Sequence, residues 1–161
     1  MRTRTKWPLH VLLAEDTDTD AELFRMAVAK CGRVRSLNVV EDGEEFIDYM
    51  MGAGAFENIH HPMPDIIFLD LKMPKQDGLD VLGWLKEHPE HSLIPKIILS
   101  NSAHEVDVQR AYELCANVFF KKPTSFFELV ALLKLTFEFW SRCERPKPAQ
   151  LQPRRTLEVH H

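Results

Sequence analysis

Short apolar runs alternate along this chain with longer segments of helical spacing. The apolar runs predict five buried strands, at residues 9–14, 34–40, 65–69, 96–99 and 118–120. Apolar residues at helical spacing predict five helices, at about residues 19–31, 44–51, 79–88, 106–114 and 125–140. Strands that alternate with helices form a parallel sheet covered on both faces. The pattern therefore predicts an α/β fold with a doubly wound, five-stranded parallel sheet and five helices.

Local signals indicate where helices begin and where the domain ends. Thr19 with Glu22, and Ser125 with Glu128, have the spacing of capping boxes and predict helix starts. The stretch GAGAFENIHHPMP before the third strand predicts a flexible loop. We expect an N-terminal extension, one domain and a loose, polar, Pro-rich tail whose last residues resemble a cloning scar, with bounds 1–7, 8–141 and 142–161.

Composition and charge narrow the functional classes. Of 161 residues, 45% are hydrophobic and 27% are charged, and the formal net charge is −4. This balance makes neither nucleic acid nor a membrane surface an expected partner, and no apolar run is long enough to span a bilayer. Three widely spaced cysteines without a CxxC motif predict reduced thiols, so we expect a cytoplasmic protein.

Polar and charged residues stand where several predicted strands end. Glu15 and Asp16 follow the first strand, Asp70 the third and Ser100 the fourth, and Lys122 comes just after the fifth. Ligands of such sheets bind at the carboxyl ends of the strands, so these side chains are expected to converge on one edge. Two carboxylates about 4 Å apart repel by roughly 4 kcal/mol at an effective dielectric constant near 20. Such a cluster must either raise a pKa or bind a cation.

The chemistry that this cluster suits is phosphoryl transfer. Carboxylate-rich sites with open positions bind Mg²⁺, which keeps several waters and accepts phosphate oxygens. A metal ion and a lysine together neutralise charge on a moving phosphoryl group. The nucleophile would be a carboxylate that forms an aspartyl phosphate.

Four segments carry a resemblance to a known family. LLAEDTDTD, IIFLDLKMPKQDG, IILSNSA and FFKKP contain, in this order, an acidic pair, an aspartate, a serine and a lysine before a proline. With these motifs the chain, from about Pro8 to Trp140, resembles the CheY-like receiver domain of two-component response regulators. The resemblance implies a flavodoxin-like sheet with strand order 2-1-3-4-5. It also implies a signalling switch that accepts a phosphoryl group from a histidine kinase, rather than a turnover enzyme.

The same resemblance assigns metal-binding roles. It makes Asp70 the phosphoacceptor and a metal ligand, and Asp16 a direct ligand of Mg²⁺, for which Mn²⁺ could substitute. Glu15 would act on the metal through water, and Lys72 would contribute its backbone carbonyl.

The resemblance to receiver domains also assigns roles on the side of the phosphoryl group that faces away from the metal. Ser100 would bond the new phosphoryl group, and Lys122 would pair with it. Phe119 stands at the position of the family's switch aromatic, which turns inward when the Ser/Thr moves. Lys72 and Ser102 occupy variable positions that flank the pocket and are expected to tune the phosphoryl lifetime.

Two alternatives belong to other functional classes. Residues 16–19, DTDT, fit the DxDxT motif of haloacid-dehalogenase-type phosphatases, with Asp16 as nucleophile and Asp18 as general acid. However, the acidic pair expected beyond the lysine is missing, and Asp70 with its MPxxDG turn stays unexplained. The second alternative is a binding module whose degenerate pocket never takes phosphate, although all pocket positions are filled here.

The last predicted helix indicates how the domain would act. No output domain follows it in this sequence, so we expect a single-domain regulator that acts by contact. The helix is apolar over more of its circumference than one sheet face needs, at Phe126, Phe127, Leu129, Val130, Leu132, Leu133, Leu135, Phe137, Phe139 and Trp140. With the long loop, this resembles the single-domain regulators served by phytochrome-type histidine kinases. That resemblance implies a bacteriophytochrome partner and a homodimer through the fifth strand and the last two helices.

Several histidines lie in polar segments without the pairing that a metal site needs. We therefore expect solvated side chains at His60, His61, His88, His91 and His104.

Overall fold

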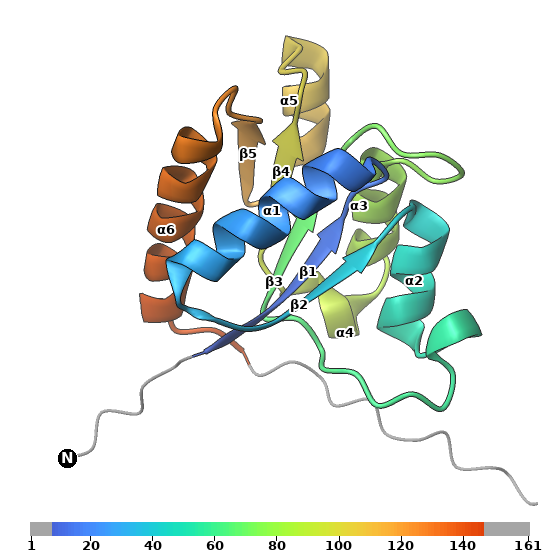
Figure 1. The fold of residues 1–161 in the computed structure, drawn as a ribbon. Helices are drawn as coiled ribbons and strands as arrows, with labels where there is room; N and C mark the ends of the chain where they lie inside the picture. Colours follow the sequence, from blue (N-terminus) through green and yellow to red (C-terminus); the bar gives the residue numbers. More distant parts are fainter. Residues whose placement is uncertain (1–7, 147–161) are drawn as a thin grey trace, which may run out of the picture.

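The computed structural model describes residues 8–146 and contains a five-stranded parallel sheet between two layers of helices (Figure 1). The strand order is β2-β1-β3-β4-β5, so the predicted fold class and strand order are confirmed. In chain order the elements are β1 (Leu9–Ala14), α1 (Asp18–Cys31), β2 (Val34–Val40), α2 (Gly43–Met51), the 3₁₀ turn η1 (Gly54–Phe56), β3 (Ile66–Leu69), α3 (Gly78–Lys86), α4 (Pro89–Ser92), β4 (Lys96–Ser100), α5 (Glu105–Glu113), β5 (Val118–Lys121) and α6 (Phe126–Arg142).

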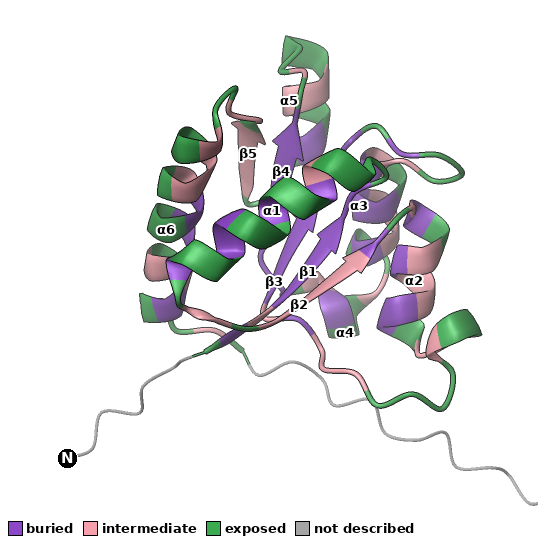
Figure 2. Cartoon of the chain, viewed as in Figure 1, coloured by how far each residue is buried: buried purple, intermediate pink, exposed green. Residues whose placement is uncertain are grey.

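Each face of the sheet packs against its own set of helices. Leu9, Val11 and Leu13 point toward α1 and α6, whereas Leu12 and Ala14 point toward α2, α3 and α5. Both faces are covered, so the central strands β1, β3 and β4 are almost entirely buried, and the edge strands β2 and β5 are half-buried (Figure 2). This explains why the central strands appear in the sequence as continuous apolar runs.

The register brings the strand ends to one edge. Ala14 lies beside Leu69 in the β1–β3 pair, and Ser100 lies beside Lys121 in the β4–β5 pair. Because all five strands are parallel, the residues that follow them leave the sheet at this carboxyl edge.

The number of helices differs from the prediction. Residues 8–146 contain six α-helices rather than five, because α4 adds one short helical turn. The sequence predicted a single helix as far as His88, but α3 ends at Lys86 and Pro89 begins a new turn. Proline suits the first turn of a helix, where its missing N–H is not needed.

The segment predicted as a flexible loop is held against α2. Residues 54–56 form the turn η1, and the Tyr49 hydroxyl donates to the carbonyl of Pro62 at 2.7 Å. The His61 ring contacts the carbonyl oxygens of Ile59 and Tyr49 at 2.9 and 2.7 Å. The prediction of a solvated His61 is therefore wrong, because its ring ties the loop to the end of α2.

Two further histidines are not solvated. His91 is buried, and its Nδ1 has no hydrogen-bond partner within residues 8–146. The ring of His88 stacks on Trp84, with centroids 4.0 Å apart. His60 and His104 are exposed, as predicted.

The two predicted capping boxes had different outcomes. Ser125 begins α6 as predicted, since its Oγ accepts from the backbone N–H of Glu128 at 3.1 Å. The cap of α1, however, is Thr17 rather than Thr19, and the Thr17 side chain makes no capping hydrogen bond. The N-cap of α1 therefore lies two residues earlier than predicted.

The predicted loose tail is wrong at its start. Helix α6 continues to Arg142, and Arg145 forms an ion pair with Asp65 at 3.3 Å. The N-terminal extension and the rest of the predicted tail, at 1–7 and 147–161, lie outside the described residues. None of the helices within residues 8–146 has the length and apolarity needed to cross a membrane.

Candidate functional site: an acidic cluster around Lys122

The carboxylates of Glu15 and Asp70 lie side by side at the carboxyl edge because β1 and β3 are neighbours. The backbone N–H of Asp70 donates to the carbonyl of Ala14 at 3.0 Å, and that of Glu15 donates to Val40 at 2.9 Å. Both continue the hydrogen bonding of the sheet by one residue, so both side chains are fixed at its rim. Glu15 and Asp70 are buried, with 3% and 5% of their surface exposed, whereas Asp16 is exposed.

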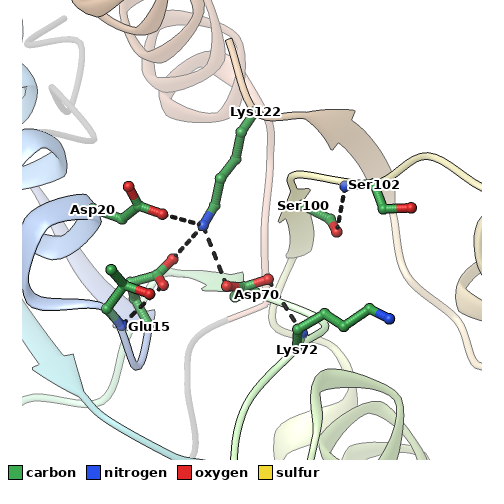
Figure 3. Close-up of polar contacts among 8 residues, drawn as sticks. Glu15, Asp20, Asp70, Lys72, Ser100, Ser102 and Lys122 are labelled. Carbon is green, nitrogen blue, oxygen red and sulfur yellow. Dashed lines mark hydrogen bonds and ion pairs between the residues drawn. The ribbon is translucent and has the colours of Figure 1, made fainter. Parts of the chain in front are cut away.

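Lys122 reaches this rim from the end of β5. Its backbone N–H donates to the carbonyl of Ser100 at 2.7 Å, which extends the β4–β5 pairing. Its ammonium donates to Glu15 at 2.7 Å, Asp20 at 2.9 Å and Asp70 at 3.2 Å (Figure 3). Lys122 is thus the cation around which three carboxylates gather.

Asp20 is the partner of Lys122 that sequence reasoning missed. It lies in the first turn of α1, and the N-cap of that helix is Thr17. An available signal was the spacing Thr17-x-x-Asp20, which places an acidic side chain three residues after the threonine that caps α1. Because the sequence placed the helix start at Thr19, Asp20 was not assigned to the strand-end rim.

Burial and pairing shift two ionisation equilibria in the cluster. Burial, with the nearby Asp70 charge added, raises the pKa of Glu15 to about 7, although the hydrogen bond from Lys122 opposes the shift. Burial alone would lower the pKa of Lys122, but its hydrogen bonds to Glu15 and Asp20 outweigh it and raise the pKa above the ordinary lysine range. Lys122 therefore stays charged at any physiological pH.

Three carboxylates of the rim are arranged so that they could share a cation. Oxygen atoms of Glu15, Asp16 and Asp70 all lie within 4.8 Å of one another. Carboxylates are the donors that hard divalent cations prefer. Since only Glu15 and Asp70 are buried and Asp16 faces solvent, a cation here would keep water ligands on its open side. The donor set therefore fits the predicted metal site.

Lys72 and Ser100 lie on the far side of Asp70 from Lys122 (Figure 3). The backbone N–H of Lys72 donates to Asp70 Oδ1 at 3.2 Å, while its side chain is exposed. Ser100 is fully buried, and its Oγ accepts from the backbone N–H of Ser102 at 3.3 Å. The carbonyl of Lys72 as a metal ligand and the Ser100 hydroxyl as a phosphoryl contact stay predictions.

Phe119, at the predicted switch position, is half-buried. Its ring packs against the hydrophobic cluster shared by α2, α3 and α5, and its backbone N–H donates to the Tyr112 hydroxyl at 3.1 Å. A change of ring position on phosphorylation stays a prediction.

A close backbone approach shapes the turn that follows Asp70. The backbone N–H of Gly78 donates to the carbonyl of Leu71 at 3.0 Å. A Cβ at residue 78 would lie 2.3 Å from the Asp70 carbonyl oxygen. Asp77, which caps α3 in a reciprocal capping box with Asp80, holds the helix start at this place. The MPKQDG segment therefore needs glycine because α3 begins against the end of β3.

Comparison with known proteins agrees with this geometry. The model of a family described as the response regulator receiver domain matches residues 11–134. The chain belongs to the response regulator receiver family. Receiver domains are signalling phosphoacceptors, and accepting a phosphoryl group is the function of this family. The haloacid-dehalogenase alternative is not favoured, because the lysine pairs with Asp70 rather than with Asp16.

Individual receivers are similar over most of this chain. Response regulator Rcp1 of Synechocystis sp. (strain ATCC 27184 / PCC 6803 / Kazusa) is 32% identical over 133 residues, 83% of this chain and 89% of Rcp1. A structure of Mn²⁺-bound Rcp1 matches with a TM-score of 0.77 and 30% identity, covering 87% of this chain and all of the other. The structure of the phosphorylated cyanobacterial phytochrome response regulator RcpA matches with a TM-score of 0.79 and 32% identity, covering 87% of this chain and 99% of RcpA. The structure of RPA3017, a response regulator in red light signalling of R. palustris, matches with a TM-score of 0.79 and 30% identity, covering 87% of this chain and 99% of RPA3017.

Proposed function

We propose that Asp70 is the phosphoacceptor of this receiver, that Mg²⁺ is its metal, and that a histidine kinase is the donor. The observation that carries the proposal is the position of Asp70. Like Glu15 it belongs to the three-carboxylate cluster and pairs with Lys122, but Asp70 is the one that lies between the Lys122 ammonium on one side and Lys72 and Ser100 on the other (Figure 3). Asp70 therefore lies where a metal ion and an ammonium can act on the same phosphoryl group.

The transfer exchanges one P–N bond for one P–O bond. A carboxylate oxygen of Asp70 attacks the phosphorus of a phosphohistidine in line, the P–N bond breaks, and the imidazole leaves with its electron pair. Lys122 donates to the phosphoryl oxygens as charge builds on them, and the Ser100 hydroxyl would bond the product. Mg²⁺, held by Asp16 and Asp70 with Glu15 acting through water, would supply charge neutralisation. Each chain accepts one phosphoryl group, so the protein acts as a switch rather than as a turnover enzyme.

Phosphorylation of purified variants tests this assignment. Wild type, Asp70→Asn and Asp18→Asn are incubated with acetyl phosphate and Mg²⁺, and the phosphoprotein is measured by intact mass and Phos-tag gels. We expect one acid-stable, base-labile phosphoryl group on wild type and on Asp18→Asn, and none on Asp70→Asn. Labelling of Asp70→Asn, or its absence from wild type, would overturn the proposal. Labelling that persists in Asp70→Asn would also favour the DxDxT chemistry, in which Asp16 is the nucleophile.

A phytochrome-type kinase is the donor we propose. The support is the similarity to Rcp1, RcpA and RPA3017, two of which are described as regulators of phytochrome or red light signalling. We propose that the exchange takes place in the cytoplasm, consistent with three free cysteines in the described residues. The test is phosphotransfer from bacteriophytochrome kinases of the same cell, with other histidine kinases of that cell as controls. Faster transfer from a kinase outside the phytochrome class would refute this part.

We propose in addition a homodimer centred on α6, with β5 and α5 at its border. Phe127 and Leu135 are 85% and 67% exposed, and both lie four residues from the small, exposed Ala131. A twofold axis passing Ala131 would place Phe127 against Leu135 of the second copy. The same axis would place Glu128 against Lys134, because these residues lie three positions on either side of residue 131. A surface that is complementary to itself in shape and charge fits an isologous dimer.

A charge exchange tests this dimer without altering the core. Glu128→Lys and Lys134→Glu should each raise the dimer dissociation constant, since each places like charges opposite one another. The double variant should restore dimerisation. Sedimentation velocity over a range of concentrations gives the readout. A monomeric wild type at high concentration, or a double variant as weak as the single ones, would contradict the arrangement.

A further inference from the structure

The ammonium of Lys122 has three protons and three carboxylate partners. Glu15, Asp20 and Asp70 accept from it at 2.7, 2.9 and 3.2 Å. An ammonium donates three hydrogen bonds, so each proton has one acceptor. The two shorter bonds go to Glu15 and Asp20, and the longest goes to Asp70. The side chain is therefore held most closely by the two carboxylates other than the phosphoacceptor.

Phosphorylation requires one of these three bonds to change. When Asp70 gains a phosphoryl group, Lys122 must direct a proton to a phosphoryl oxygen. The proton that now reaches Asp70 can turn to it, because it makes the longest bond and already points to that side. In Figure 3, Asp20 and Asp70 approach the ammonium from different directions, and the bond to Glu15 lies between them. The bond to Asp20 can therefore persist while the bond to Asp70 is exchanged.

Glu15 cannot both hold Lys122 and serve a metal ion equally well. It belongs to the carboxylate cluster with Asp16 and Asp70, whereas Asp20 does not. A cation in that cluster would attract the Glu15 carboxylate and weaken its bond to Lys122. Asp20 would then be the carboxylate that continues to hold the ammonium in place.

We propose that Asp20 is a positioning residue, which holds Lys122 within reach of the phosphoryl group while Glu15 serves the metal. The inference rests on the proposed function of Asp70 and adds a residue of α1 to the site. Asp20 is suited to this role because its side chain is 34% exposed, against 3% for Glu15 and 7% for Asp70. A partly hydrated carboxylate can pair with Lys122 without adding a third desolvated charge to the buried cluster.

If Asp20 positions Lys122, replacing Asp20 should lower the rate of phosphorylation and leave the affinity for Mg²⁺ nearly unchanged. In Asp20→Ala, Lys122 loses one charge-assisted hydrogen bond, and we expect the rate of phosphorylation by acetyl phosphate at saturating Mg²⁺ to fall by about tenfold. The apparent Mg²⁺ dissociation constant should change by less than about threefold, because Asp20 lies outside the cluster. Asp20→Asn keeps an oxygen acceptor of the same shape and should recover part of the rate.

Asp18→Ala is the matched control. Asp18 lies in the same first turn of α1 and is exposed, so its loss removes the same favourable interaction with the helix dipole without touching Lys122. Thermal unfolding of each variant shows whether it is folded, and Asp20→Asn replaces Asp20→Ala in the comparison if the latter is not.

The outcomes separate this inference from the proposed function. If wild type is not phosphorylated, the assignment of Asp70 fails. If wild type and Asp20→Ala react at the same rate, the positioning role of Asp20 is wrong while Asp70 stands. A parallel loss of rate and Mg²⁺ affinity would also overturn the role, since Asp20 would then act through the metal. A slow rate with unchanged Mg²⁺ affinity, and partial recovery in Asp20→Asn, supports it.

Discussion

The close approach of α3 to the end of β3 makes Gly78 a sensitive position. A Cβ there would lie 2.3 Å from the carbonyl oxygen of Asp70 and 2.9 Å from the α-carbon of Leu71. Both neighbours are backbone atoms, so Gly78→Ala can be accommodated only if α3 or the Asp70–Leu71 peptide moves. Overpacking costs about 1–3 kcal/mol, and we expect the upper end of this range because no flexible side chain can yield.

Gly83→Ala in the same helix supplies the control. A Cβ at residue 83 would meet no atom within 4 Å, so alanine should stabilise the helix by about 0.5–1 kcal/mol. In a domain of this size about 1 kcal/mol corresponds to roughly 2–4 °C in Tm. We therefore expect Gly78→Ala to melt about 5–10 °C below wild type, and Gly83→Ala to melt at or slightly above it.

Thermal and urea unfolding followed by circular dichroism measure these differences. The rate of Asp70 phosphorylation is the second readout, because a displaced Asp70–Leu71 peptide also moves the phosphoacceptor. Equal stability and equal rates for Gly78→Ala and Gly83→Ala would refute the reasoning. A loss of stability with an unchanged rate would show that α3 moves and the end of β3 does not.

Three further predictions concern charge. Asp16→Asn should abolish the rise in Tm that Mg²⁺ produces relative to EDTA, with little change in EDTA itself, because Asp16 is exposed; a variant that still responds to Mg²⁺ would contradict its role as ligand. Burial raises the pKa of Glu15 from 4.5 to about 7, so the folded state binds its proton more tightly and the metal-free protein should lose stability as pH rises through this window. Glu15→Gln should lack that loss, and parallel urea midpoints for the two proteins between about pH 5 and about pH 8 would count against it. Burial lowers the pKa of His91, so wild type should lose stability as pH falls below about 6.5, and His91→Gln, measured by the same midpoints, should lose less.

Predictability of the site from sequence depended on where each residue lies relative to a strand. Glu15, Asp70 and Lys122 follow apolar runs, and the direction of a parallel sheet is enough to bring them to one edge. Asp20 lies within a helix, where a shift of two residues in the helix start turns its side chain by about 200°. Its place beside Lys122 therefore depended on the cap at Thr17, and the sequence offered Thr19, with Glu22 three residues later, as a competing cap.

The errors in the fold have the same kind of cause. His91 lies among polar residues, and its burial results from packing against Trp84, whose ring centroid is 5.9 Å away, rather than from its own neighbours. Helix α4 is too short to show a helical period, and the proline that begins it stands directly after the end of the helix predicted for residues 79–88. Arg145 stands at the start of a Pro-rich stretch, and its partner Asp65 is eighty residues away in sequence. Contacts over such distances leave no local pattern.

The anchoring of Arg145 to Asp65 has a practical consequence for measuring kinase binding. Asp65 precedes β3 and Pro8 precedes β1, so both ends of the described chain emerge at the amino edge of the sheet. Asp70 lies at the other end of β3, roughly 15 Å away at about 3.3 Å per residue. Immobilising the protein on a sensor chip through either terminus should therefore leave the face around Asp70 turned toward the flowing analyte.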